Sequence, residues 1–256
     1  MNINELVLEK INNVSLRDPA NNTLSVRLTN VKDGSLTSAA EGTAVTDNVG
    51  ASIMTLYNAA TATLTGTNAL FSMDLAGAQL GEEKVEATSE AKITSSTYEV
   101  KEAKDNTLTL DKEPLKDSLK EICLLVNGGI SKKFTLATGT AGDDTFTIAG
   151  KVITLKEGTT GSFYIEYDYE SEKAVKVTKK ADKFPGVYEA RVYVTMHSAC
   201  NKNDIYTGVI IAKRAEIDPS SIEIGLNAEG GHPFTLNFNK EYCDTKGELF
   251  SIIVDE

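Results

Sequence analysis

The segment from Asn48 to Met73 carries no charged residue, although 25% of the 256-residue chain is Asp, Glu, Lys or Arg. Apolar and hydroxyl-bearing residues alternate within it: one parity holds Met54, Leu56, Ala60, Ala62 and Leu64, and the other holds Thr55, Tyr57, Thr61, Thr63 and Thr65. A period of two is typical of β-strands with two different faces. Because solvent-facing strands usually carry Lys or Glu, we expect these strands to be covered, either by their own fold or by a neighbouring subunit.

If a neighbouring subunit covers residues 49–66, the contact is expected to use one parity of the pattern. The residues of that parity are Ile53, Thr55, Tyr57, Thr61, Thr63 and Thr65. Thr, Asn and Gly interrupt the segment too often for the roughly 20 apolar residues that a bilayer-spanning helix needs. The sequence therefore predicts no contact with a membrane.

Short β-type runs dominate the rest of the chain. Residues 24–30, 162–169, 188–197 and 206–213 are examples, and glycine-containing turns such as 127–129 separate many of the runs. Many short strands divided by turn signals are typical of an antiparallel β-sandwich or barrel. The sequence therefore predicts a mainly β fold.

One helix is predicted over residues 69–80, with Thr67 or Asn68 as its N-cap and Gly81 at its C-terminal end. Its apolar residues run nearly all round, and Ser72 and Gln79 mark its only polar stripe. Such a helix is buried on most faces. The side chains expected to be largely buried are Leu70, Phe71, Met73 and Leu75. Phe71→Ala is accordingly expected to cost about 3–5 kcal/mol, as core aromatic truncations do.

Composition changes near residues 97–104 and again near 173–186. Between them lies a set of short strands with its own turns. This pattern predicts an Ig-like β module over residues 99–178, inserted into a main β domain formed by residues 1–98 and 179–256. The alternative is one continuous sandwich.

The formal net charge is −11 and the isoelectric point is near 4.8. Neutralising nucleic-acid phosphates requires a concentrated positive surface, so this balance argues against a nucleic-acid binder. The lysines between residues 173 and 183 are interspersed with acids, which is typical of a solvated loop. An acidic surface suits a channel that passes DNA without holding it.

Catalytic and metal-binding patterns are scarce. His197 and Cys200 are three residues apart at a strand end, where their side chains would rarely make the contact that a nucleophile pair needs. Asp143 and Asp144 lack the ligand series of a calcium loop and are expected at a hairpin tip. No phosphate-binding loop or nucleophile elbow occurs. We therefore expect no enzymatic activity, no cofactor and no metal.

Cysteine usage indicates where the chain is made. The cysteines are Cys123, Cys200 and Cys243, an odd number without a C-x-x-C pair. This usage predicts reduced thiols. Residues 1–10 lack the pattern of a secretory signal, so synthesis in a cytosol is expected.

Four segments are similar to bacteriophage virion proteins of the tail-tube (major tail) family. They are TGTNALFSMDLAGAQLGEEK (65–84), ITLKEGTTGSFYIEYDY (153–169), ADKFPGVYEARVYVTMHSACNKND (181–204) and HPFTLNFNKEYCDTKGELFSIIVDE (232–256). The order of elements resembles that family over most of the chain. The resemblance implies a β-sandwich or barrel with a flanking helix.

The resemblance also implies a function. Six copies would form a ring, the rings would stack into a tube, and phage DNA would pass through it without specific binding. The partners would be further copies and other virion tail proteins, and the location would be the phage tail, after synthesis in the host bacterial cytoplasm. The alternatives are a capsid-associated decoration protein and a monomeric β-sandwich that binds carbohydrate or mediates adhesion.

Overall fold

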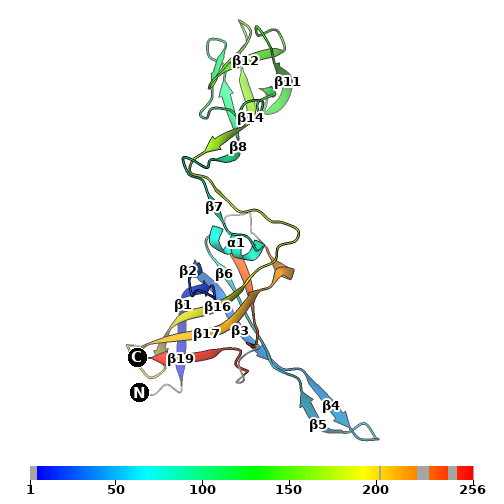
Figure 1. Ribbon diagram of the computed structural model, residues 1–256, viewed down its shortest axis with the longest axis vertical. Coiled ribbons are helices and arrows are strands. Elements are labelled where there is room, and N and C mark those ends of the chain that lie inside the picture. The colour runs from blue at the N-terminus through cyan, green and yellow to red at the C-terminus, as the bar shows by residue number, and fades with distance from the viewer. Residues whose placement is uncertain (1–4, 202, 224–230, 242–246, 256) are drawn as a thin grey trace. The chain divides into compact units, whose positions relative to one another are not determined.

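The computed structural model describes residues 5–201, 203–223, 231–241 and 247–255, and its fold is mainly β (Figure 1). The chain forms two compact units. Unit 1 comprises Met1–Lys84 and Val177–Glu256, and unit 2 comprises Val85–Lys176. The predicted fold class, antiparallel sheets with a barrel-like sheet and one helix, is confirmed for the described residues.

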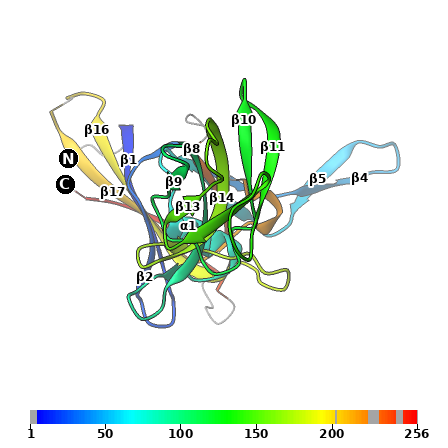
Figure 2. The ribbon, with the colours of Figure 1, turned by 90° about the horizontal axis from the view of Figure 1, so that it is seen from above.

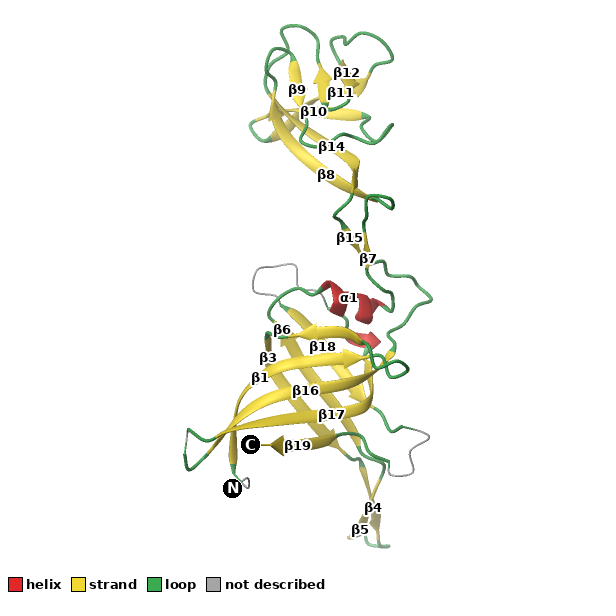
Figure 3. Ribbon diagram, turned by 60° about the vertical axis from the view of Figure 1, so that its left-hand side comes forward, coloured by secondary structure: helices red, strands yellow, loops and turns green. Residues whose placement is uncertain are grey.

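Unit 1 is built on a nearly closed, barrel-like antiparallel sheet (Figure 3). Its strands follow the order β2-β1-β16-β17-β18-β6-β3, and β19 pairs with the other half of the long strand β17. The elements of unit 1 are β1 (Leu6–Arg17), β2 (Leu24–Leu28), β3 (Val31–Ala39), β4 (Gly42–Thr46), β5 (Ser52–Tyr57), β6 (Thr61–Asn68), α1 (Met73–Leu80), β16 (Val187–Ser198), β17 (Ile205–Ile217), the 3-10 turn η1 (Pro219–Ser221), β18 (His232–Phe238) and β19 (Ser251–Asp255).

The core of unit 1 lies inside this sheet. Alternate residues of β6 and β18 point inward, including Leu64, Leu236 and Phe238. Helix α1 lies at one end of the barrel and adds Leu75 and Ala78 to the same core (Figure 3). The alternating pattern of β6 thus predicts its buried face correctly.

The helix is shorter than the predicted span of residues 69–80. It begins at Met73, with Ser72 as the N-cap, and not after Thr67 or Asn68. The reason is that β6 continues to Asn68, which pairs with the first residue of β18. The C-terminal prediction is confirmed, because Gly81 ends the helix in the left-handed conformation with φ of 73°.

Two of the four side chains expected in the core lie outside it. Leu70 is 60% exposed and Phe71 53% exposed, because both belong to the connection before the helix. Leu75 is fully buried as predicted, and Met73 is partly buried. Gln79, expected on the polar stripe, is buried. The expected cost of 3–5 kcal/mol for Phe71→Ala is therefore too high.

Unit 2 contains a second sheet, with the strand order β8-β14-β10-β11-β12-β13-β9. Its core holds the aromatic residues Phe134, Phe146, Phe163 and Tyr167. The strands of this unit are β7 (Val85–Glu86), β8 (Ile93–Glu102), β9 (Thr107–Thr109), β10 (Glu121–Val126), β11 (Gly129–Leu136), β12 (Thr145–Ala149), β13 (Val152–Thr154), β14 (Ser162–Ser171) and β15 (Val175–Lys176).

The two ends of unit 2 lie side by side. Val85 pairs with Lys176, and Glu86 pairs with Val175, in the short antiparallel ladder between β7 and β15. Unit 2 begins at Val85, earlier in the sequence than residue 99, because it includes β7 and the whole of β8. That unit 2 folds by itself stays a prediction.

Candidate subunit interface

The uncharged segment contains two strands, β5 and β6. β5 and β6 are separated by residues 58–60. β6 pairs with β3 in the barrel sheet, whereas β5 pairs with β4 in a separate two-stranded hairpin. The hairpin extends beyond the barrel (Figure 1), and Figure 2 shows it pointing away from β16 and β17.

Both faces of the β4–β5 hairpin are open to solvent. Every residue of β4 and of β5 is exposed. The exposed large apolar side chains of the hairpin are Val45, Val49, Ile53, Met54, Leu56 and Tyr57. The chain's own fold therefore covers the apolar face of β6 but neither face of β5, and coverage of β5 by a neighbouring subunit stays a prediction.

Asp47, the one charged residue of the hairpin, stabilises its turn. Asp47 Oδ1 accepts hydrogen bonds from the backbone N–H groups of Val49 (3.0 Å) and Ala51 (2.8 Å). Gly50, with φ of 88°, provides the left-handed conformation that the turn needs. The carboxylate is thus engaged at the tip, and the strands themselves carry no charge.

Tyr57 lies across the hairpin from Gly42. A β-carbon at Gly42 would come within 3.0 Å of Tyr57 Cε1, so the absence of a side chain leaves room for the ring. Tyr57 is nevertheless 72% exposed. One edge of the Tyr57 ring therefore packs against the backbone at Gly42, and most of the rest of the side chain faces solvent.

The threonines of β6, which include the predicted contact residues Thr61, Thr63 and Thr65, alternate with its buried residues. Thr61 and Thr65 are exposed, and Thr63 is partly buried with its hydroxyl 3.2 Å from Asn237 Oδ1 on β18. Ile53, Thr55 and Tyr57 lie on β5 in the hairpin. The six predicted contact residues are therefore divided between the hairpin and the barrel sheet; that they contact another subunit stays a prediction.

An exposed apolar hairpin is unusual for a protein that acts alone. Strand edges with unpaired backbone groups and apolar side chains invite pairing with other chains. Natural sheets protect such edges with Lys or Pro, and β4 and β5 contain neither. We call the β4–β5 hairpin, residues 42–57, the arm. Its exposure fits a segment that another chain covers.

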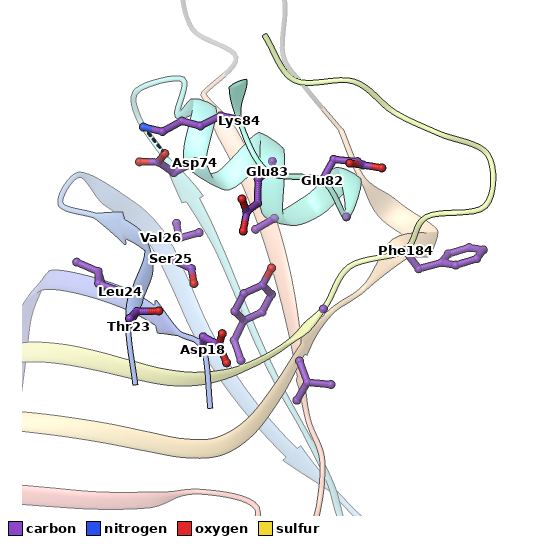
Figure 4. Close-up of a pocket in the computed structure, with 16 residues that line it drawn as sticks. Asp18, Thr23, Leu24, Ser25, Val26, Asp74, Glu82, Glu83, Lys84 and Phe184 are labelled. Carbon is purple, nitrogen blue, oxygen red and sulfur yellow. Dashed lines mark ion pairs between the residues drawn. The ribbon is translucent and has the colours of Figure 1, made fainter. Parts of the chain in front are cut away.

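A cavity of about 620 Å³ lies beside α1, between the helix, the start of β2 and the segment before β16 (Figure 4). Asp18, Asp74, Glu82 and Glu83 line it. Lys84 Nζ lies 2.9 Å from Asp74 Oδ1, and Lys180 Nζ lies 2.8 Å from Glu82 Oε1. The cavity is therefore rich in carboxylates, two of which are engaged in ion pairs.

Electrostatics within this cavity follow from burial and from these acids. Burial raises the pKa of the Tyr188 hydroxyl, and Asp18 and Glu83 raise it further. The hydrogen bond from Lys180 lowers the pKa of Glu82. A phosphate group would meet negative charge here, so the cavity is unsuited to binding nucleic acid.

The residues considered for catalysis or metal binding do not form a site. His197 Nε2 lies 2.8 Å from Glu9 Oε2 on β1, whereas Cys200 is exposed in the turn after β16. Asp143 and Asp144 form ion pairs with Lys156 and Lys132. Among the described residues, no group of three or more His, Cys, Asp or Glu side chains could hold a metal ion.

The acidic pair is predicted at a hairpin tip. Asp143 and Asp144 lie in the connection between β11 and β12, which pair in parallel, so the predicted hairpin tip is wrong.

The cysteines that the structure describes are free thiols. Cys123 is buried and Cys200 is exposed, and Cys243 lies outside the described residues. Burial raises the pKa of Cys123, and the neighbouring Glu121 adds to this shift; the neutral thiol that results is a poor nucleophile.

Comparison with known proteins identifies the family of the chain. No curated protein matches the chain. In the part of the chain that the structure describes, no helix has the length and apolar character to span a membrane. The model of one family, described as the YomU/Tube protein family, matches residues 6–252 and so covers nearly the whole chain. The chain therefore belongs to the YomU/Tube protein family, a family of structural phage tube proteins.

Proposed function

We propose that this protein is the repeating subunit of a phage tail tube, in which six copies form a ring and rings stack into a conduit for DNA. The observation that carries the proposal is the exposed β4–β5 hairpin, whose two strands carry no charge. A contact between unlike surfaces of identical chains closes into a ring or continues as a filament. Such contacts would cover the arm and its strand edges.

The overall charge supports a passive conduit. Each subunit has a net charge of −11, and a ring concentrates that charge around its axis. If acidic groups outnumber Lys and Arg on the inner wall, duplex DNA meets repulsion and finds no strong binding site along it. The DNA would then slide through the tube.

Electron microscopy of the purified protein, together with light scattering after size exclusion, tests assembly. Rings or tubes are the expected result, and a stable monomer at high concentration would contradict the proposal. Binding of the assembled protein to duplex DNA at low salt tests the conduit. Negligible binding is expected, whereas micromolar binding that weakens steeply with salt would reveal a basic DNA-binding surface.

We also propose that unit 2 is an inserted module that is dispensable for assembly and projects outward from the tube. The pairing of Val85 with Lys176 supports the proposal, since adjacent ends allow excision with a short bridge. The test joins Lys84 to Val177 through a short Gly/Ser linker. Soluble protein that still assembles is expected, and misfolding of this variant would favour one interdependent fold.

A further inference from the structure

A closed hydrogen-bond network joins the start of β18 to both ends of α1. His232, the first residue of β18, is fully buried, with a relative exposure of 0%. Its Nδ1 lies 3.2 Å from the backbone nitrogen of Ser72, and its Nε2 lies 2.8 Å from Gln79 Oε1. Gln79 Nε2 in turn donates to the carbonyl oxygen of Pro233 at 2.8 Å.

The partners assign one protonation state to the ring. The Ser72 N–H can only donate, so Nδ1 must be unprotonated and accept. The ring proton therefore lies on Nε2 and is donated to Gln79 Oε1, while the bond to Pro233 fixes the orientation of the Gln79 amide. Each polar group of the two side chains has a partner when His232 is neutral.

This network completes the N-terminal cap of the helix. Ser72 Oγ accepts the N–H of Leu75, which is the first half of a capping box. The second half requires Glu or Gln at the position of Leu75 to accept the Ser72 N–H, but Leu75 is buried in the barrel core. His232 supplies the missing acceptor from a strand about 160 residues away.

Protonation would break this arrangement. A second ring proton on Nδ1 would face the Ser72 N–H, so two donors would meet. The N-terminal end of a helix carries partial positive charge, which further disfavours an imidazolium beside it. Phe71 stacks on the ring at a centroid distance of 5.0 Å, but a cation over an exposed aromatic face gains too little to offset the loss of these hydrogen bonds.

Among the described residues packed around the ring, no charge is placed to compensate. β6 contains no titratable residue, and His232 is the one titratable residue of β18. On α1 the acid is Asp74, which pairs with Lys84, and β3 carries Lys32 and Asp33. Burial lowers the pKa of His232, with no contribution from a neighbouring charge.

We propose that His232 is a pH-sensitive latch, which holds the N-terminal end of α1 on the barrel while its imidazole is neutral and releases it on protonation. The released ring titrates near the ordinary value of about 6.5, and the docked ring titrates lower. The released state therefore binds more protons between these two values. Docking is fully stable above the ordinary value and weakens as the pH falls through it.

Hydrogen exchange of the full chain, measured from about pH 7.5 to pH 5 and corrected for the intrinsic pH dependence of amide exchange, tests the latch. Protection of residues 73–80 is expected to fall by up to about tenfold per pH unit below about pH 6.5. His232→Asn keeps an acceptor near the Nδ1 position, and its helix protection is expected to be independent of pH. The matched control is His197→Gln, which removes the other histidine and is expected to respond like the wild type.

Unchanged protection of α1 in the wild-type protein down to about pH 5 would overturn the proposal, as would loss of the response in His197→Gln. If His232→Asn does not fold, nuclear magnetic resonance of the wild-type imidazole decides instead. A proton on Nε2 and a titration below the ordinary value support the latch. A proton on Nδ1 at neutral pH, or a titration at or above the ordinary value, contradicts it.

Discussion

Replacing Tyr57 with alanine is the sharpest test of the arm, because this side chain is large, exposed and predicted to lie at a contact. Tyr57 is 72% exposed, and a tyrosine presents on the order of 200 Å² of surface. About 140 Å² is therefore available for burial by another subunit, worth an upper limit of about 3.5 kcal/mol. Because alanine retains part of that area, we expect a loss of about 2–3 kcal/mol per contact, the scale of an interface hot spot.

The assay measures the protein concentration at which assemblies form, by light scattering and by sedimentation. A loss of about 2–3 kcal/mol raises this concentration by about 30- to 150-fold, since each 1.4 kcal/mol is a factor of ten. The fold of the monomer should change little, because substitutions at exposed positions usually stay within about 0.5 kcal/mol. Circular dichroism checks that expectation.

Tyr98 on β8 offers a matched control. It is 67% exposed, lies in unit 2 and is not among the predicted contact residues. Tyr98→Ala is expected to leave the assembly concentration unchanged. If Tyr57→Ala also leaves it unchanged, the arm does not carry the contact; if both variants raise it equally, exposed tyrosine surface matters without regard to position.

Four other variants test the core, the end of the helix and the predicted contact. Leu75→Ala should lower the free energy of unfolding by about 2–5 kcal/mol, because Leu75 is in the core. Phe71→Ala loses only stacking on His232 and should lower the free energy of unfolding by about 0.5–1.5 kcal/mol. Equal losses in urea unfolding would contradict the observed burial. Gly81→Ala should destabilise by at least about 1–2 kcal/mol, because the residue has φ of 73° and a β-carbon would lie 2.2 Å from Phe184 O; a gain in thermal stability would be incompatible with this geometry. Replacing both Thr61 and Thr63 with Lys should abolish assembly by juxtaposing like charges, at a cost of several kcal/mol per contact; assembly at the wild-type concentration and salt would place the contact elsewhere.

The features that sequence predicts well here are those fixed by neighbouring residues. Alternation along β6 identifies Ala62 and Leu64 as core residues, and Gly81 ends the helix because its backbone conformation favours glycine. Both are local effects of chain geometry. No distant partner is needed to infer them.

The features that the sequence leaves undetermined depend on distant partners. The helix begins at Met73 because Asn68 continues a ladder with His232, and Gln79 is buried because His232 and Pro233 satisfy its amide. His232, by contrast, follows two glycines and is typical of a turn in the sequence alone. A local pattern contains no information about such pairings.

The candidate interface shows the same division. The uncharged segment predicts that β5 is covered, but an uncharged strand inside a fold and one covered by another subunit have the same sequence pattern. Only the structure places β5 outside the barrel, in a hairpin with β4.

Exposure on both faces of the hairpin makes a further prediction about that covering surface. Tyr57 lies on one face of β5 and Leu56 on the other, and both are exposed. A single flat contact would bury one face and leave the other in water, whereas an arm held in a groove, or between two neighbouring copies, would be buried on both. Leu56→Ala is therefore expected to raise the assembly concentration as Tyr57→Ala does, in proportion to the smaller area of leucine. If Leu56→Ala assembles like the wild type while Tyr57→Ala does not, the arm is covered on one face and its other face remains in solvent.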